Sequence, residues 1–569
     1  MLNIVEHKVD LCIIGGGLAG MGAAIEAAKH GIKTLLMHER PVLGGNASSE
    51  IRMWVCGCWG YMETGLIEEL RQENIFRNPN GNYSIWDLLL YEKVRFQENL
   101  TLLLNCSCMD ATMDGSNIKS IKGWQLTTQE FHNVEAKFFA DCSGDSILAP
   151  LTGAKFRWGR ESKLEFNESM APDKEDKCTM GLSCLMQARE TNEPQKFTPP
   201  SWINHYPDDT PLKNRYHNLG PYQNFWFIEL GGQGDTIKDT EILRDELLKT
   251  SLGVWDHIKN HGEHEAENWA LDWIGFLPGK RESRRYEGDY IMTQEDILEG
   301  RTFPDCVAYG GWPLDDHYPA GFLHKGEPNT HVYPKQPYGI PLRALYSKNI
   351  DNLFFAGRNI SASHMALSST RVMATCMLLG QAVGSAAITC INKNVSPRTA
   401  AKEYIAEIQQ RLMNDDCTLP GFSRKRSNLT LNAKLVVSNG QNSDILRTGQ
   451  DRGEGNYWSA QANDFAEYEF DTPQDISQIR VIFDTNLERT GLEGRNLPAG
   501  YPLKITPKEI SVKTISGFSI FADDKEIYQT SDQHLRYFCL PVKLKAKKIR
   551  LQINQTRGEN GNIFAFDVN

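Results

Sequence analysis

The sequence predicts an α/β protein in which a parallel-sheet domain is interrupted by an α+β lobe and followed by an all-β sandwich. Three observations predict this class. The opening residues alternate strand, helix and strand patterns around a glycine-rich turn. The middle, roughly Glu165–Pro334, is richer in tryptophan, tyrosine, proline and charge, and its strand and helix signals are mixed. From about Phe422, short alternating runs recur between Gly, Pro, Asn and Asp turns, which is typical of a β-sandwich.

The first strand is expected at Val9–Ile14, an apolar run that leads directly into glycines. Alanine-rich helical patterning then fills Leu18–His30 and stops at Gly31, a residue type that commonly ends helices. A second apolar run, Lys33–Met37, closes on the acidic Glu39. Strand, helix and strand in this order form a βαβ unit, which implies a parallel sheet.

The segments on both sides of the middle region are expected to build one domain. After the insertion, Asn352–Ala356 is another apolar strand, and a long small-residue helix follows from about Ser368 to Cys390. The predicted parts are the first half of the parallel-sheet domain at 1–164, the inserted lobe at 165–334, the second half at 335–395, a helical linker at 396–421 and the sandwich at 422–569.

Composition and charge exclude several classes of protein. The chain has 569 residues and a net charge of -11, which gives no basic surface for a nucleic-acid backbone. No uninterrupted apolar run reaches the roughly 18 residues of a membrane-spanning helix, so no membrane span is expected. The 13 cysteines lack framework spacing and contain no C-x-x-C pair, so reduced thiols and no metal site are expected. The polar N-terminus does not resemble a secretory signal, so we expect a cytoplasmic location, or a periplasmic one if a leader has been removed.

The segment Gly15-Gly-Gly17-Leu-Ala-Gly20 matches G-x-G-x-x-G directly after the first strand and at the start of the first helix. Such glycines permit a tight turn and close backbone approach, and the helix N-terminus offers unpaired N–H groups to a pyrophosphate. Glu39, about 20 residues further on, can accept the ribose hydroxyls. The pattern therefore predicts a dinucleotide site, with a purely structural glycine turn as the alternative.

Three further segments separate FAD from NAD, which the glycine motif alone does not. They are Arg40–Asn46 directly after the acid, Ala140–Asp145 at a strand end, and Asn352–Arg358 at another strand end before a helix. With the runs G-K-R-E-S-R-R and A-G-R-N-I-S-A-S-H-M-A-L-S-S-T-R, they make residues 1–395 resemble the bacterial FAD-dependent oxidoreductase family. That family has a Rossmann-like, two-dinucleotide-binding-domain flavoprotein fold similar to that of glutathione reductase.

The resemblance implies non-covalently bound FAD and a set of residues that hold it. These residues are Gly15, Gly17, Gly20, Glu39, Arg40, Gly45, Asn46, Asp145, Gly357, Arg358 and Arg371. It also implies that Asp145 accepts a hydrogen bond from the ribityl chain and that Arg358 lies near the phosphates or the flavin edge.

Two residues are expected to converge beside the flavin ring. His364 follows the A-G-R turn and could take a hydroxyl proton while hydride passes to flavin N5, or donate a proton in the reverse direction. A helix-capping or buried structural histidine is the alternative. Arg52 follows the G-G-N-A-S-S-E loop, and its guanidinium fork suits a carboxylate or polar substrate oxygens.

The inserted lobe adds two further catalytic candidates. Arg284 belongs to the cluster Lys280–Arg285, which suits anionic groups or forms a salt-bridged face. His317 ends the run Asp315-Asp316-His317, which could supply a base or a metal ligand or form loop salt bridges. Four aromatic residues could stack on a sugar ring or pack in the core: Trp273, Trp312, Tyr318 and Tyr338.

A dithiol relay is not expected, because Ala47 stands where glutathione-reductase-like enzymes carry a redox cysteine. Cys56 and Cys58 are interpreted as ordinary thiols, with a redox disulfide or covalent flavin attachment as alternatives.

The resemblance implies an FAD-dependent oxidoreductase that transfers a hydride between flavin N5 and a small polar substrate, a carbohydrate or sugar derivative. The C-terminal sandwich resembles galactose-binding-like, discoidin-type domains, which favours a carbohydrate. Two alternatives stay open: a flavin-dependent reductase of an activated double bond or dicarboxylate, and a non-catalytic FAD-containing glycan-binding protein. The sequence leaves the electron acceptor and the oligomeric state open.

Overall fold

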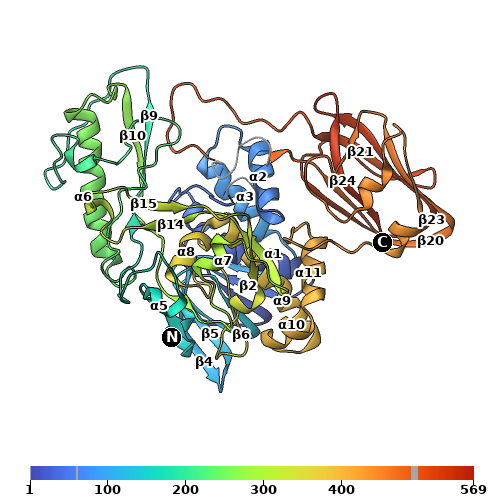
Figure 1. Cartoon of the computed structure of the whole chain (residues 1–569), viewed down its shortest axis with the longest axis horizontal. Coiled ribbons are helices and arrows are strands. Elements are labelled where there is room, and N and C mark those ends of the chain that lie inside the picture. The colour runs from blue at the N-terminus through green and yellow to red at the C-terminus, as the bar shows by residue number, and fades with distance from the viewer. Residues whose placement is uncertain (1, 59–61, 488–496) are drawn as a thin grey trace. The chain divides into compact units, whose positions relative to one another are not determined.

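The computed structural model describes residues 2–58, 62–487 and 497–569 (Figure 1). The chain forms two compact units, and each is described by itself. The first contains Met1–Tyr61, Asn80–Ile408 and Gly494–Pro507, and the second contains Met62–Pro79, Gln409–Glu493 and Lys508–Asn569. We expected the sandwich to begin at about Phe422. In the structure, the C-terminal part of the unit that holds the sandwich begins earlier, at Gln409, and the unit also includes a helix from the first eighty residues.

A parallel sheet in the first unit positions the candidate site. Its strands are β1 (Ile4–Ile14), β2 (Thr34–Met37), β3 (Leu100–Leu103), β6 (Glu130–Asp141) and β17 (Leu353–Phe355). Ile14 lies opposite both Met37 and Asp141, and Phe355 also lies opposite Asp141. The four strands β1, β2, β6 and β17 therefore end in register, so the loops that follow them meet at one edge of the sheet.

β6 belongs to two kinds of pairing along its length. Its first residues pair antiparallel with β5 (Asn117–Gln125), which pairs in turn with β4 (Cys106–Asp114). Its last residues pair parallel with β17. The sheet order is thus β3-β2-β1-β6-β5-β4, with β17 joined to β6, and the expected parallel-sheet fold is confirmed.

Two helices cross in close contact beneath this sheet edge, α1 (Leu18–Lys29) and α9 (Met373–Lys393). A Cβ added to Gly380 would lie 2.0 Å from the carbonyl oxygen of Ala19, and one added to Gly384 would lie 2.7 Å from that of Ala23. Only glycine allows this approach. α9 is also long and apolar enough to cross a membrane, but its residues are buried within the unit.

The single helix expected at about Ser368–Cys390 is two helices in the structure. α8 (His364–Thr370) ends at Arg371, and α9 begins after Val372, whose φ of -68° and ψ of 145° are extended. The extended residue breaks the helical hydrogen bonds and sets the N-terminus of α9 beside the loop at Cys56, whose carbonyl accepts from the Ala374 N–H at 3.0 Å. The remaining helices of the unit are α3 (Tyr83–Arg95), α4 (Leu148–Thr152), α5 (Lys163–Phe166), α6 (Thr240–Asp256), α7 (Gln294–Leu298) and α10 (Pro397–Glu403).

The inserted lobe has its own hydrophobic core, in which α6 packs beside β9 (Met186–Glu190) and β10 (Trp269–Ile274) (Figure 1). Buried members include Met186, Phe225, Leu247 and Trp255. Short strand pairs complete the region: β7 (Phe156–Arg157) with β12 (Arg285–Tyr286), β8 (Leu182–Ser183) with β11 (Gly279–Lys280), β13 (Cys306–Gly310) with β16 (Tyr338–Pro341), and β14 (Leu314–His317) with β15 (Asn329–Val332).

The second unit contains the expected all-β sandwich, and all its strand pairs are antiparallel. The order is β19-β24-β20-β23-β21-β22, with β18 joined to β20. Its strands are β18 (Lys434–Val437), β19 (Trp458–Ala460), β20 (Phe465–Phe483), β21 (Ile515–Ala522), β22 (Lys525–Thr530), β23 (Tyr537–Thr556) and β24 (Gly561–Val568). Its helices are α2 (Leu66–Arg77) and α12 (Asn428–Asn432), while α11 (Ile405–Asn414) spans the boundary.

Glu68 of α2 is a buried charge that ties this helix into the second unit. Its carboxylate pairs with Arg452, lies 3.6 Å from Arg536 and accepts from Thr485 Oγ1 at 2.5 Å. Burial would raise the pKa of Glu68, but Arg452 and Arg536 outweigh burial and hold the pKa below its usual value. The stabilisation is therefore present at neutral pH and is lost as the pH falls through the lowered pKa.

Glu68→Gln should lower the free energy of unfolding of the second unit by about 3 kcal/mol, because it leaves buried arginine charge without its counter-charge. Calorimetry of the full chain reads this as an earlier melting transition for the sandwich. Asp471→Asn, at an exposed acid of β20, should change the stability by less than about 0.5 kcal/mol. Equal melting of both variants would show that Glu68 does not hold α2.

Candidate functional site

The glycine turn between β1 and α1 contains glycines that the fold of the chain requires and one, Gly17, that it does not. Gly15 has φ +102°, and a Cβ there would lie 2.4 Å from the Cys142 carbonyl oxygen, while one at Gly20 would lie 1.8 Å from the Gly15 oxygen. The chain itself requires these two glycines. Gly17 has an ordinary φ of -67°, and its Cβ would meet only the Gly45 Cα, at 3.8 Å. Its missing side chain leaves space for a ligand at the N-terminus of α1, where a pyrophosphate fits.

The turn at Gly44, Gly45 and Asn46 packs directly against Gly17. The Gly44 N–H donates to the Gly16 carbonyl at 2.9 Å, which fixes the two glycine segments side by side. The Asn46 side-chain amide donates to the Lys280 carbonyl at 3.0 Å and so joins the turn to the inserted lobe. Gly17 and Gly45 are thus in backbone contact, since a Cβ on Gly45 would lie 3.1 Å from the Gly17 Cα, and the open space beside Gly17 lies at the N-terminus of α1.

Two arginines border this space with unsatisfied N–H groups. Arg40 and Arg358 are 18% and 17% exposed, and the Nε of each is buried without a hydrogen-bond partner among the described residues. Burial lowers the pKa of Arg40, Glu50 and Glu39 oppose this effect, and the charge of Arg358 lowers the pKa further. Two mutually repelling cations with unused donors are stabilised by an anion between them. The residues present therefore fit the two phosphates of FAD.

Asp145 follows β6 and holds two cations at this edge. It accepts from Arg358 Nη2 at 2.8 Å, Ser283 Oγ at 2.7 Å and Lys280 Nζ at 2.7 Å. Burial would raise the pKa of Asp145, but Arg358 and Lys280 outweigh burial and hold the pKa well below its usual value. Asp145 is therefore an anion that orients Arg358. Its Oδ1 accepts two of these hydrogen bonds and its Oδ2 accepts one, so Oδ2 retains a lone pair that could serve a ribityl hydroxyl.

His38 was not among the expected site residues. It follows β2 directly, and its Nδ1 accepts from the Gly16 N–H at 3.0 Å while Nε2 lies 3.0 Å from the Val42 carbonyl. Burial and the charge of Arg40 lower its pKa to about 3, so it is neutral and can accept. The neighbouring Glu39 is exposed after β2, at the position expected of the ribose-binding acid.

A buried triad of Glu282, His364 and Asp316 lies at the start of α8. His364 Nδ1 is 2.9 Å from Glu282 Oε2, and Nε2 is 3.0 Å from Asp316 Oδ1. Burial would lower the pKa of His364, but Glu282 and Asp316 outweigh burial and raise the pKa to about 10. His364 is therefore an imidazolium at neutral pH with both N–H groups already donated. The exposed fractions are 0% for Glu282, 2% for His364 and 19% for Asp316, so Asp316 is the member that solutes can reach.

Arg285 contacts the triad through Glu282 and through Glu161. Its Nη1 donates to Glu161 Oε1 at 3.0 Å, and its Nε lies 3.4 Å from Glu282 Oε1. Glu161 also accepts from the His364 backbone N–H at 2.9 Å. These contacts fix both ends of the His364 imidazole in one orientation.

His317 lies in a second charged network on the other face of β14. Its Nδ1 is 2.6 Å from Glu229 Oε2, and its Nε2 is 3.5 Å from Asp315 Oδ1. Arg281 lies 3.5 Å from Glu229, and Arg371 lies 3.0 Å from Asp315. Burial would lower the pKa of His317, but Glu229 and Asp315 raise it above its ordinary value. Because strand side chains alternate, Asp315 and His317 share one face and Asp316 takes the other.

A match to a known protein family shows which family this chain belongs to. The family model described as FAD dependent oxidoreductase matches residues 10–412, most of the chain. The chain belongs to the FAD-dependent oxidoreductase family. Its cofactor is FAD, and the residues Gly17, Gly45, Arg40 and Arg358 are those that would hold the phosphates in this FAD-dependent oxidoreductase.

Individual similarities are limited in extent. A soluble pyridine nucleotide transhydrogenase from Marinobacter nauticus is 31% identical over 77 residues, which cover 14% of this chain and only 15% of that protein. The p-nitrophenol 4-monooxygenase from Pseudomonas putida is 10% identical, with 71% of this chain and 85% of that chain covered and a TM-score of 0.32. The family 32 carbohydrate-binding module from Streptococcus pneumoniae EndoD is 10% identical, with 25% and 99% covered and a TM-score of 0.20.

In this oxidoreductase Arg52 occupies a separate aromatic setting. Its guanidinium lies 4.8 Å from the Tyr83 ring centre and 4.3 Å from that of Trp273, and Nη1 donates to Gln187 at 2.7 Å. Its φ of 61° is a left-handed conformation that costs a non-glycine residue energy, and such strain is concentrated at functional sites. Among the described residues, Arg52 donates to Ser49 and Gln187, whereas the His364 ring pairs with Glu282 and Asp316, so no hydrogen bond joins Arg52 to His364.

The remaining expected residues are distributed around these clusters. Arg284 Nη1 donates to the Asp145 carbonyl at 3.3 Å and faces the Phe156 ring, so it lies with the FAD cradle and not with His317. Arg371 is bonded to Asp315. The aromatic residues do not form one platform: Trp273 covers Arg52, Trp312 donates to Asp315, Tyr318 stacks on His324, and Tyr338 is buried against Ser369. Cys56 is half-buried and Cys58 is buried.

Proposed function

We propose that this FAD-dependent oxidoreductase oxidises an alcohol carbon of a small polar substrate of the sugar or sugar-derivative class, with Asp316 as the proton acceptor. The observation that carries the proposal is the Glu282–His364–Asp316 triad, of which Asp316 alone has an accessible side chain. A carboxylate that is fixed by a permanent imidazolium and open on its other side suits proton exchange with a hydroxyl group.

This assignment revises our expectation for His364. We expected the imidazole itself to exchange the proton, but both ring nitrogens are occupied by carboxylates and the raised pKa keeps the ring charged. His364 is therefore a positioning residue that holds Asp316 and balances its charge.

FAD, when bound, supplies the hydride acceptor. The substrate carbon gives up a hydride as the O–H bond of its hydroxyl group breaks. The electrons of that O–H bond form the carbon–oxygen double bond, and the proton passes to a carboxylate oxygen of Asp316. The Arg52 Nη2, which makes no hydrogen bond to the described residues, is available to bind a substrate oxygen.

A carboxylate and a guanidinium fork suit the hydroxyl groups of a polyhydroxylated substrate, since they offer acceptors and donors. Anaerobic rapid mixing of the oxidised protein with aldoses, polyols and glycosides should bleach the flavin with at least one of them. Flavin that instead stays oxidised with every sugar, but is reoxidised by a dicarboxylate with an activated double bond after chemical reduction, would establish the reductase alternative. A flavin inert in both directions would favour the non-catalytic alternative.

Arg52→Ala should raise the substrate concentration needed for half-maximal flavin reduction by at least about tenfold, because a charged hydrogen bond to the substrate is lost. FAD content should not change. Arg189→Ala is the matched control, since Arg189 also stacks on an aromatic ring, that of Tyr501 at 4.4 Å, and pairs with Asp272. An identical concentration dependence in both variants and the wild type would remove Arg52 from the substrate site.

A further inference from the structure

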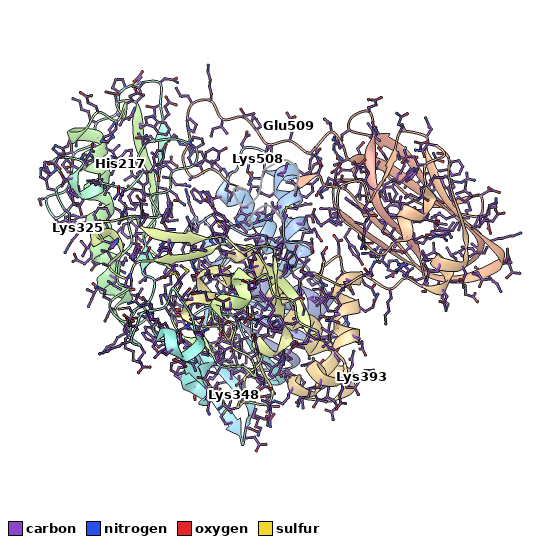
Figure 2. The ribbon with its side chains drawn as sticks, viewed as in Figure 1. His217, Lys325, Lys348, Lys393, Lys508 and Glu509 are labelled. Atoms are coloured by element: carbon purple, nitrogen blue, oxygen red, sulfur yellow. The ribbon has the colours of Figure 1, made fainter. Side chains whose placement is uncertain are left out.

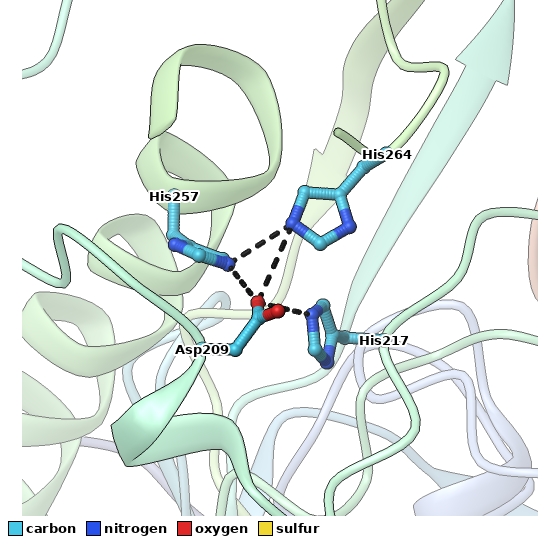
Figure 3. A group of neighbouring side chains, drawn as sticks. All are labelled: Asp209, His217, His257 and His264. Atoms are coloured by element: carbon cyan, nitrogen blue, oxygen red, sulfur yellow. Dashed lines mark hydrogen bonds and ion pairs between the residues drawn. The ribbon is translucent and has the colours of Figure 1, made fainter. Parts of the chain in front are cut away.

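We infer that Asp209, His217, His257 and His264 of the inserted lobe form a binding site for one divalent transition-metal ion of the zinc type (Figure 3). None of these residues belongs to the FAD cradle or to the triad at His364. Figure 2 shows His217 in the lobe that contains α6, and Figure 3 shows the three imidazoles turned toward the Asp209 carboxylate.

The ligand atoms are at distances that a single ion can bridge. Asp209 Oδ1 lies 2.9 Å from His257 Nε2, 3.5 Å from His217 Nε2 and 3.8 Å from His264 Nε2, and the two nitrogens of His257 and His264 are 3.0 Å apart. A tetrahedral zinc with ligands at about 2.0–2.1 Å separates them by about 3.3 Å. Three imidazole nitrogens and one carboxylate oxygen are a set that zinc accepts.

The hydrogen bonds behind two of the rings fix which nitrogen faces the cluster. His257 Nδ1 lies 2.9 Å from the Tyr206 carbonyl, and His217 Nδ1 lies 2.6 Å from the Arg215 carbonyl. A carbonyl only accepts, so each Nδ1 carries the hydrogen. In the neutral rings the Nε2 lone pairs of His257 and His217 therefore face the Asp209 carboxylate, and that of His257 also faces the His264 Nε2, so the cluster gathers ligand atoms that a cation can bridge. Backbone carbonyls that orient histidines in this way are typical of metal sites.

The surroundings also favour a cation. The side chains of His257, His264 and His217 are 1%, 8% and 13% exposed, whereas Asp209 is 73% exposed and borders a surface pocket. The ion therefore has an entry path on the Asp209 side. His257 caps the C-terminus of α6, where helix carbonyls favour positive charge, and it opens a π-helical turn, His257–His261, of the kind common at functional sites.

A neighbouring group, His205, Asp256 and His261, provides a matched comparison. It offers only three ligand atoms, and the His205 side chain is 62% exposed. An ion at the four-residue site would instead tie the segment from Asp209 to His217 onto the end of α6, which gives the site a structural role in the lobe.

The test uses the full-length, FAD-loaded protein, freed of metal with a chelator and titrated with Zn²⁺ against a chromogenic competitor. The wild type should bind one zinc per chain, and X-ray absorption should show imidazole ligands. Asp209→Ala and His217→Ala should each weaken zinc binding by at least about tenfold. Each removes one of the four ligand atoms, and this lowers zinc affinity more than the loss of a hydrogen bond behind a ligand does. Both residues border the pocket, and the flavin spectrum reports that each variant is folded.

His205→Ala should bind zinc like the wild type. Three results would overturn the inference: no zinc bound by the wild type, unchanged zinc affinity in Asp209→Ala and His217→Ala, or zinc lost in His205→Ala alone, which would place the ion at the neighbouring group.

Discussion

The Gly17→Val protein should fold and purify without FAD. Gly17 has an extended, unstrained backbone, and a Cβ there comes no closer to the chain than 3.8 Å, at the Gly45 Cα. The branched side chain of valine covers the N-terminus of α1 and blocks approach of the pyrophosphate to it. The ratio of flavin to protein absorbance should fall to background while circular dichroism stays that of the wild type.

Gly115→Ala controls for a general loss of stability. Gly115 has φ +59° with no atom near its added Cβ, so alanine there is strained by about 1 kcal/mol but lies in open space. This variant should keep its FAD. If Gly17→Val also kept FAD, the pyrophosphate would not lie at the N-terminus of α1 beside Gly17.

Asp316→Asn should slow flavin reduction by about 10²–10⁴-fold, the usual worth of a positioned proton acceptor, with FAD still bound. His364→Gln should also slow the reaction, because it removes the charge that orients Asp316, but with little change in the concentration dependence on substrate. His324 is another histidine of the inserted lobe, and it stacks on Tyr318. His324→Gln should behave as the wild type. Reduction at the wild-type rate in Asp316→Asn would contradict the assignment.

His364 also predicts a pH dependence of stability. Its pKa rises on folding from 6.5 to about 10, so its stabilisation is fully present below pH 6.5 and is lost as the pH rises through about 10. The effect is on the order of a few kcal/mol. The wild type should therefore lose more thermal stability than His364→Gln between neutral pH and pH 10, and parallel losses would show that the imidazolium pairs do not form.

The parts of the fold that depend on local patterns were predictable from sequence. The glycine turn, the acid after β2 and the strand that precedes Gly357 can each be recognised from a few consecutive residues. The carboxyl ends of parallel strands then have to meet at one edge of the sheet. The contribution of α2 to the second unit was not predictable, since Glu68 meets Arg452 and Arg536 across hundreds of residues.

The candidate site shows the same limit. His364 was identifiable as a site residue, but its partners Glu282 and Asp316 are 82 and 48 residues away, so the occupation of both nitrogens depends on tertiary packing. The separation of Asp316 from His317 has a sequence signal, the alternation of side chains along a strand, once the run is recognised as β14. The histidines at 217, 257 and 264 follow no ligand spacing, and only the folded lobe brings them together.

The most direct test of the central claim is anaerobic single-turnover reduction of the flavin by a reactive sugar, compared with the same sugar carrying deuterium at the oxidised carbon. Bleaching should be slower with the deuterated sugar in the wild type and slower still in Asp316→Asn, because the carbon–hydrogen bond breaks as the flavin is reduced. Bleaching at equal rates with both sugars, or none with any sugar, would contradict hydride transfer from this class of substrate.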